Sequence, residues 1–274
     1  MVVASRNRRV ELLQTIPRHR AVTVLVDNHS SDGTAAAAHG AFPDLSVMRL
    51  ARNGGAFART IGARAASSEF VAFADDDSWW APGSLHAAAD ILASHPAVAA
   101  VVARILVGPQ ERVDPISTVM ARSPPSPASG HPTLVGFVAC ATMVRRSAFL
   151  AVGGFDHIVR FPGEEERVAL DLVNHGHQIV YADALTVHHH PSPRRHNPAA
   201  RTSAVTRSSI LTAVMRLPRP VVADRIRCAW HGSAATRRGA RVAARDLLPA
   251  VRERHVVTSA VLRELAVLAD QSRR

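Results

Sequence analysis

The sequence predicts an α/β protein built on a mostly parallel sheet. Apolar runs too short for a helix recur along the first 190 residues, and residues 70–74 show the pattern most clearly. Helical segments separate these runs, and such alternation gives parallel strands joined by right-handed crossovers. The run at 70–74 leads directly into Asp75, Asp76 and Asp77. Because ligands of open α/β sheets bind beyond the carboxyl ends of the strands, the sequence also predicts where a ligand would lie.

The expected elements follow from composition and from stop signals. Strands are expected at residues 2–4, 22–26, 45–50, 70–74, 98–107, 134–144 and 179–187. Helices are expected at residues 8–16, 34–39, 56–67, 82–94, 147–152 and 164–175. Pro17 stops the first helix and Gly176 stops the last. Residues 108–132 are rich in proline, so we expect a long loop there.

Charge divides the chain into two regions. There is no lysine, so all 33 basic residues are arginine. Residues 1–193 carry 16 Arg and 17 Asp and Glu, whereas residues 194–274 carry 17 Arg and 5 Asp and Glu. The formal net charge of +11 therefore arises in the second region. We predict an α/β domain at 1–193 and a basic, mostly helical extension at 194–274.

Composition also limits the class of protein. Two cysteines, Cys140 and Cys228, exclude a disulfide-rich scaffold and favour a reducing, cytoplasmic location. No apolar run approaches the ~20 residues of a membrane-spanning helix, and no signal peptide is visible. The opening residues look like the second half of a strand, so we expect a clipped or unusually short start. A basic nucleic-acid binder is disfavoured, because the charge is confined to the C-terminal region and aromatic residues make up only 4% of the chain.

Asp75, Asp76 and Asp77 are the first candidate site. Three adjacent carboxylates repel one another at the end of a buried strand, so they favour a bound cation. The alternative is an acidic turn before a helix, for which Pro82 would suit the first turn.

Two other strand ends lie on the same expected edge. Ser5, Arg6 and Asn7 follow the first strand, and Asp27 and Asn28 follow the second. Amide and carboxylate groups there can recognise a nucleobase or a sugar hydroxyl. Turn formation and helix capping are the alternative role for each of them.

Glu165 is the third candidate. At ~100° per residue it falls near the centre of the apolar face that Val168, Ala169, Leu172 and Val173 form. An acid there is costly unless it has a partner or a task. Its neighbours Glu164 and Glu166 suit the positive end of the helix dipole, and that is also the alternative role of Glu165.

Several stretches, in this order, carry a resemblance to a known family. They are residues 26–34 (VDNHSSDGT), 52–55 (RNGG), 75–77 (DDD) with Pro82 following, 144–146 (VRR), 153–156 (GGFD), 163–165 (GEE) and the histidine run 188–190. The sequence resembles the family 2 glycosyltransferases, inverting enzymes with a GT-A fold that use nucleotide-sugar donors. The resemblance covers residues 2–190.

The resemblance implies specific roles. The nucleotide-sugar pocket would be formed by Ala4, Ser5, Arg6, Asn7, Asp27, Asn28, Asn53, Gly54, Arg59, Asp75 and Asp76. A divalent metal, Mg²⁺ or Mn²⁺, would be held by Asp75 and Asp77 with His189, or with His188 in reserve. Glu165 would be the general base, at a position where the family usually has Asp. Thr60 stands where the family has Asn.

The implied reaction moves a sugar from a nucleotide diphosphate to a hydroxyl of a glycan, lipid-linked or natural-product acceptor, as in cell-envelope polysaccharide synthesis. A protein that binds the nucleotide sugar without turnover is the alternative.

The basic extension has two possible roles. Its apolar residues recur near helical spacing, at Ile210, Leu211, Val214, Leu217, Val221, Val222, Ile226 and Trp230. Such helices can lie on an anionic membrane at the inner face of the cell membrane. The alternative is that the apolar faces pack on the α/β domain while the arginines face water.

Overall fold

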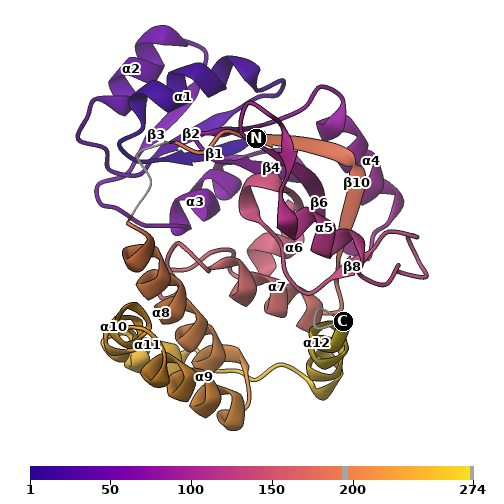
Figure 1. Ribbon diagram of the computed structural model, residues 1–274. Helices are drawn as coiled ribbons and strands as arrows, with labels where there is room; N and C mark the ends of the chain where they lie inside the picture. The colour runs from indigo at the N-terminus through magenta and orange to yellow at the C-terminus, as the bar shows by residue number, and fades with distance from the viewer. Residues whose placement is uncertain (193–196, 272–274) are drawn as a thin grey trace.

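The computed structural model describes residues 1–192 and 197–271 and contains a mixed sheet with helices on both faces (Figure 1). The strand order is β3-β2-β1-β4-β9-β6-β10-β5, with β7 beside β6 and β8 beside β10. The strands are β1 (Val2–Ser5), β2 (Val24–Asp27), β3 (Ser46–Arg49), β4 (Phe70–Ala74), β5 (Ser78–Trp80), β6 (Val98–Val107), β7 (Arg112–Val113), β8 (Thr133–Leu134), β9 (Thr142–Arg145) and β10 (Gln178–His189).

Most strands of the main path run in one direction. β1 pairs in parallel with β2 and β4, β2 with β3, and β6 with β10. β9 lies antiparallel between β4 and β6, so those two strands share a direction. On this path β9 and β5 run against the others. The predicted mostly parallel sheet is confirmed.

The helices form a layer on each face of the sheet. They are α1 (Arg9–Thr15), α2 (Thr34–Ala41), α3 (Phe57–Ala65), α4 (Ser84–Ser94), α5 (Pro115–Ala121), α6 (Arg146–Ala151), α7 (Glu165–Asn174), α8 (Pro198–Arg216), α9 (Arg219–His231), α10 (Ala234–Ala244), α11 (Leu247–Arg252) and α12 (Ser259–Gln271), with short 3-10 turns at Ile16–Arg18 and Ala139–Ala141. Successive residues of β1 point to opposite faces. Val3 packs in one apolar cluster with Leu12 of α1 and Ala38 of α2, whereas Val2 packs with Ala63 of α3 in another.

Three expectations about the elements were wrong. Residues 108–132 hold β7 and α5 rather than a continuous loop. Pro115 stands in the first turn of α5, where a proline favours helix initiation, and the Asp114 carboxylate accepts a hydrogen bond from the Ile116 amide at 2.9 Å. Residues 134–144 are not one strand, because β8 pairs with β10 while β9 pairs with β4 and β6, so the chain turns between them. β5 was not expected at all.

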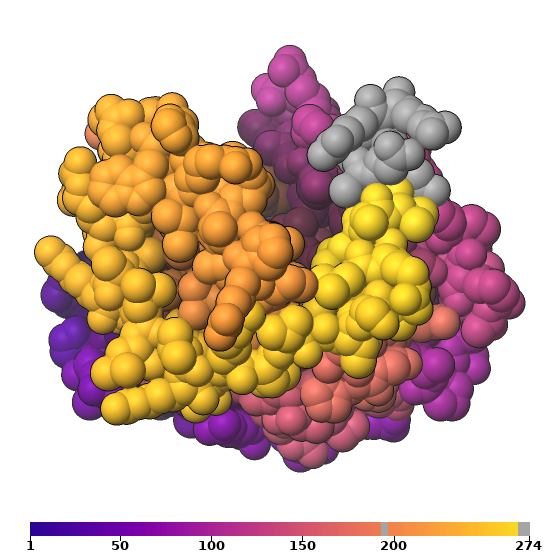
Figure 2. Space-filling model, turned by 90° about the horizontal axis from the view of Figure 1, so that it is seen from below, coloured from indigo at the N-terminus to yellow at the C-terminus, as the bar shows by residue number. Residues whose placement is uncertain are grey.

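The C-terminal helices cover the lower part of the molecule, as Figures 1 and 2 show. The apolar residues in the second half of α8 and the residue after it are buried, namely Ile210, Leu211, Val214, Met215 and Leu217, whereas Val205 is 40% exposed. These residues pack on Val159 and Leu170 of the α/β region and on α9, α10 and α11, as the packing alternative expects for apolar faces. Arg207 and Arg216 of α8 are buried as well, so the expectation that the arginines face water is wrong for them. On α9 the situation differs, because Val221 is 36% exposed and Trp230 is 46% exposed. None of the helices in the described residues has the length and hydrophobicity needed to cross a membrane.

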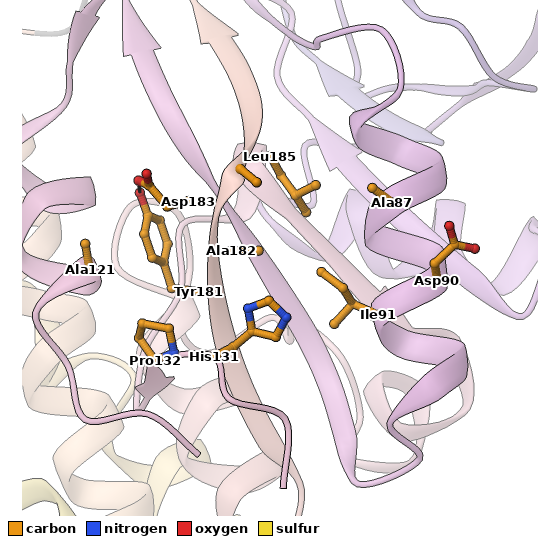
Figure 3. Close-up of a pocket in the computed structure, with 11 residues that line it drawn as sticks. Ala87, Asp90, Ile91, Ala121, His131, Pro132, Tyr181, Ala182, Asp183 and Leu185 are labelled. Atoms are coloured by element: carbon orange, nitrogen blue, oxygen red, sulfur yellow. Dashed lines mark hydrogen bonds between the residues drawn. The ribbon is translucent and has the colours of Figure 1, made fainter. Parts of the chain in front are cut away.

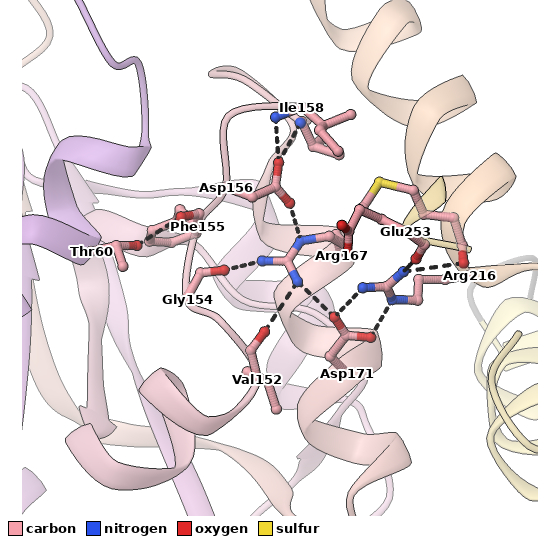
Figure 4. A network of polar contacts seen from close by, with 12 residues as sticks. Thr60, Val152, Gly154, Phe155, Asp156, Ile158, Arg167, Asp171, Arg216 and Glu253 are labelled. Carbon is pink, nitrogen blue, oxygen red and sulfur yellow. Dashed lines mark hydrogen bonds and ion pairs between the residues drawn. The ribbon is translucent and has the colours of Figure 1, made fainter. Parts of the chain in front are cut away.

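A buried polar network joins α7 to the C-terminal helices (Figure 4). The Asp171 side chain is 2% exposed and accepts hydrogen bonds from Arg167 Nη1 at 2.6 Å and from Arg216 Nη2 at 3.0 Å. Arg216, at the end of α8, also donates to the Glu253 carbonyl at 2.8 Å. One carboxylate of α7 thus holds the end of α8 and the segment after α11 in place.

Candidate active site

The carboxyl ends of the central strands bring the predicted residues to one edge of the sheet. Ser5 at the end of β1 is in register with Asp27 at the end of β2, and Val3 is in register with Ala74 at the end of β4. Residues 5–7, 27–28 and 75–77 therefore follow three neighbouring parallel strands, which confirms their predicted common edge.

Asp27 and Asn28 have different surroundings. Asp27 is fully buried, and its Oδ2 accepts a hydrogen bond from the Ser30 amide at 3.3 Å and lies 3.6 Å from Arg49 Nε. Its Oδ1 has no hydrogen-bond partner within the described residues. A buried acceptor without a partner is costly, so a hydrogen-bond donor placed beside Oδ1 would be favourable.

Asn28 instead shapes the loop that contains Asn53 and Gly54. Its amide nitrogen donates to the Gly55 carbonyl at 2.9 Å, and its amide oxygen accepts from the Gly54 amide at 2.7 Å. Asn53 caps the same turn, because its side-chain oxygen accepts from the Gly55 amide at 2.9 Å. These side chains position backbone around the site.

The loop after β1 is tied to its neighbours in a similar way. Asn7, at a left-handed φ of 54°, accepts a hydrogen bond from the Ser31 amide at 2.8 Å through its side-chain oxygen. Ser5 Oγ donates to Asp76 Oδ2 at 2.9 Å. Ala4 is half-buried and Arg6 is exposed. Burial, together with the charges of Asp75 and Asp77, raises the pKa of Asp76 to about 8.

Arg59 of α3 connects the acid cluster to α7. It forms an ion pair with Asp75, and its Nη1 lies 3.1 Å from Glu164 Oε1. Burial disfavours the charge of this guanidinium, but Asp75 and Glu164 outweigh that cost and raise its pKa. Burial and the negative charge of Glu165 raise the pKa of Glu164, whereas Arg59 opposes the rise. The buried Arg59 cation thus holds Asp75, which follows β4, near Glu164, which precedes α7.

His189 lies beside Asp77. β5 runs antiparallel to β10 with Ser78 opposite His189, and this register brings the end of β10 to the acid cluster. His189 Nε2 is 3.3 Å from Asp77 Oδ1. The Ser192 amide donates to Asp77 Oδ2 at 3.2 Å, and the His190 amide donates to the Asp77 carbonyl at 2.8 Å.

The structure does not bring the other two predicted metal ligands to the same point. His188 Nδ1 is 2.8 Å from Glu111 Oε1, and its ring stacks on Trp79 with 5.2 Å between centroids. Asp75 faces Arg59. Neighbouring residues of a strand point to opposite faces, so the His188 side chain points away from the position that His189 occupies beside Asp77.

The groups at this edge fit a divalent metal that is coordinated by protein side chains and by a bound phosphate. Over residues 1–192 and 197–267, no three His, Cys, Asp or Glu side chains converge on one point. Asp77 and His189 do converge as a pair. A carboxylate suits Mg²⁺ or Mn²⁺, and an imidazole favours Mn²⁺, so the pair fits a metal that completes its shell with phosphate oxygens and water.

The acids at the start of α7 are not arranged as helical periodicity predicted. Glu164 is 1% exposed, whereas Glu165 and Glu166 are half-buried. The expectation that Glu165 would be the acid centred on the buried face was wrong. Residues 167–172 are all buried because α8 covers α7 on the side away from the sheet, so the helix has no single apolar stripe.

Glu165 instead opens into a cavity of about 440 Å³, which we call the α7–α9 cavity. Its walls are residues 135–137, Gly163, Glu165 and Glu166, Val205 and Ser209 of α8, and Arg225 of α9. The C-terminal helices therefore supply part of the surface beside Glu165. Nothing in the sequence indicated Arg225, because it lies among many arginines and in no motif.

A second cavity of about 450 Å³ lies between α4 and β10 and is shown in Figure 3. Ile91, Tyr181 and Leu185 are among its lining residues. Tyr181 donates a hydrogen bond to Asp183 Oδ1 at 2.7 Å. None of the predicted site residues lines this cavity.

Comparisons with known proteins identify the family of the chain. The family model described as Glycosyl transferase family 2 matches residues 2–153. Comparison with curated proteins gave no match.

Solved structures with the same fold include three that contain nucleotide ligands. The S. aureus TarS fragment 1-349 in complex with UDP has a TM-score of 0.59 and 16% identity, over 91% of this chain and 80% of that one. The mannosyltransferase PcManGT from Pyrobaculum calidifontis, in complex with GDP-Man and Mn²⁺, has a TM-score of 0.59 and 20% identity, over 100% of this chain and 79% of that one. GalNAc-T7 with UDP, GalNAc and Mn²⁺ has a TM-score of 0.57 and 14% identity, over 88% of this chain and 53% of that one.

The family match spans more than half of the chain and includes residues 5–7, 27–28 and 75–77 at the sheet edge. The chain belongs to glycosyl transferase family 2 and has the GT-A fold.

Proposed function

We propose that the chain is an inverting, metal-assisted glycosyltransferase that moves a hexose from a nucleotide-diphosphate sugar to an acceptor hydroxyl. The observation that carries the proposal is the link made by Arg59, because it joins the acid cluster after β4 to the acids that begin α7. In this proposal the groups that hold the diphosphate and Glu165, the neighbour of Glu164, would lie around one centre.

The nucleotide would lie along the ends of β1 and β2. Asp27 Oδ1, buried and without a partner in the described part of the chain, would accept an N–H of the base. The 53–55 loop, held by Asn28, would form the adjacent wall. UDP in the TarS complex and GDP-Man in the PcManGT complex support a nucleotide ligand of this kind.

Asp77 and His189 would hold the divalent metal, and Asp75 would add to the negative field while paired with Arg59. A metal bound there supplies positive charge that favours departure of the nucleoside diphosphate. The Mn²⁺ in the PcManGT and GalNAc-T7 structures supports this assignment.

Glu165 would act as the general base. Its carboxylate faces the α7–α9 cavity, and it lies close enough to Arg59 to contribute to that group's raised pKa. It would take the proton of the acceptor hydroxyl, which attacks the anomeric carbon from the face opposite the leaving group. A single displacement inverts the configuration at that carbon.

The decisive experiment is a thermal-shift measurement with UDP and GDP, each with and without Mn²⁺. A ligand at about 100 times its dissociation constant raises the free energy of unfolding by roughly 2.7 kcal/mol. In Asp77→Asn the Mn²⁺-dependent part of the shift should disappear while the ligand-free melting temperature changes little. A wild-type shift that Mn²⁺ does not increase, or one that Asp77→Asn retains in full, overturns the metal assignment.

Nucleotide binding without turnover would instead support the alternative of an inactive nucleotide-sugar-binding protein. A cytoplasmic location with peripheral membrane contact through residues 194–274 also stays a prediction. The exposed Val221 and Trp230 of α9 favour it.

A further inference from the structure

We propose that the α7–α9 cavity is the acceptor subsite, that it selects an uncharged, hydroxyl-rich acceptor such as a neutral sugar, and that Arg225 positions this acceptor. The inference rests on the proposed function, because it assumes that Glu165 receives the acceptor's proton. It adds the substrate class and a role for the C-terminal helices.

The cavity is built from both regions of the chain. Gly163, Glu165 and Glu166 come from the start of α7, whereas Ser209 and Arg225 come from α8 and α9. α8 approaches closely at this point, since a Cβ built on Gly163 would lie 3.1 Å from Ser208 Cβ. The helices that follow the GT-A fold are therefore part of the wall that an acceptor would touch.

Arg225 is held in a fixed orientation at this wall. Its two terminal nitrogens reach the two oxygens of Glu166, with Nη2 at 2.5 Å and Nη1 at 3.0 Å. Nη1 also donates to the Ser209 carbonyl at 2.8 Å and lies 3.0 Å from Ser209 Oγ. The side chain stays 25% exposed, so part of it remains accessible to a ligand. A guanidinium fixed by a carboxylate and a helix carbonyl loses little freedom when it binds a further hydroxyl.

The charge of the cavity decides which acceptor it takes. Glu166 is ion-paired with Arg225, and Glu165 forms no ion pair within the described residues, so the lining carries a net negative charge at Glu165. A phosphate or carboxylate on the acceptor would face that negative charge, and no unpaired cation of the described part of the chain lines the cavity. A neutral sugar meets no such penalty, because its hydroxyls donate to Glu165 and Glu166 and accept from Arg225.

The rest of the lining and the size agree with a sugar. Val135, Phe137 and Val205 add apolar surface of the kind that the C–H face of a sugar ring covers. A volume of about 440 Å³ lies within the ~300–1,000 Å³ of small-molecule sites.

The test uses the full-length protein and two matched probe pairs, the p-nitrophenyl glycosides of glucose and glucuronic acid and those of galactose and galacturonic acid. Binding is followed by ligand-observed NMR in the presence of Mn²⁺ with UDP or GDP. We expect at least one neutral glycoside to bind more tightly than its acidic partner. Arg225→Ala should weaken that binding at least tenfold.

Glu166→Gln should shift the ratio of acidic to neutral affinity roughly fivefold toward the acidic probe, which is the effect of a partly exposed ion pair. A loss of structural support alone would weaken both probes without changing this ratio. Arg227→Ala is the control, because Arg227 lies on the same helix, is paired with Asp224 and does not line the cavity.

Nucleotide binding separates this inference from the proposed function. Arg225→Ala should leave the Mn²⁺-dependent thermal shift with UDP or GDP at its wild-type size. If the wild type lacks that shift, the proposed function fails. If the shift is present but the wild type binds no glycoside, prefers the acidic partner, or binds equally after Arg225→Ala, the acceptor inference is overturned.

Discussion

Asp171→Asn should destabilise the whole protein, because Asp171 is the shared partner of two buried arginines. The carboxylate is 2% exposed and each arginine side chain is 4% exposed. After the substitution Arg167 keeps Asp156, whose Oδ2 lies 2.6 Å from its Nε. Arg216 keeps only carbonyl partners within the described residues. The cost therefore falls mainly on Arg216, which becomes a buried cation without a carboxylate.

Removing one partner of a buried ion pair costs about 3–5 kcal/mol. At roughly 2–4 °C per kcal/mol for a chain of this size, the melting temperature should fall by about 6–20 °C. The control is Asp224→Asn, since Asp224 is 55% exposed and pairs with an arginine that is 69% exposed. That change should alter the melting temperature by no more than about 2 °C. Calorimetry of both variants decides the matter, and an Asp171→Asn melting temperature within 2 °C of the wild type would refute the reasoning.

Two further predictions concern pH and membranes. Burial lowers the pKa of His19 to about 4, so between pH 6.5 and 4 the unfolded chain binds a proton that the folded chain does not. The free energy of unfolding should thus fall as the pH falls through this window, by up to ~1.4 kcal/mol per pH unit. His19→Phe should reduce that slope when unfolding by urea is measured at several pH values. An unchanged slope would contradict the lowered pKa of His19. The basic helices should bind vesicles containing anionic lipid, and the binding should weaken as salt is raised, because screening limits the attraction to ~8 Å at physiological ionic strength. Co-sedimentation that is equal for neutral and anionic vesicles, or absent at low salt, would leave residues 194–274 as a packing element alone.

The sequence predicted the parts of the fold that depend on local signals. Short apolar runs ending in polar residues identified β1, β2 and β4, and because these strands are parallel their polar ends had to meet at one edge. The proximity of His189 to Asp77 was expected only from the family resemblance, since it depends on the short strand β5, which no local pattern indicated.

What the sequence could not show depends on long-range packing. Periodicity placed Glu165 on the buried face of α7, but α8 covers a second face, and Glu164 is the acid that becomes enclosed and paired with Arg59. In the same way, Arg225 reaches Glu166 across 59 residues of sequence, and no single-residue signal distinguishes it from the other arginines of the extension.

The central claim is that Glu165 is the base of a sugar transfer. The most direct measurement is the turnover number for release of UDP or GDP from a nucleotide sugar, at saturating donor and Mn²⁺, for the wild type, Glu165→Gln and Glu165→Asp. The account predicts that Glu165→Gln keeps donor binding and loses about 10²–10⁴-fold in turnover, while Glu165→Asp, which restores the residue usual in the family, retains part of it. Wild-type turnover in Glu165→Gln would contradict the account.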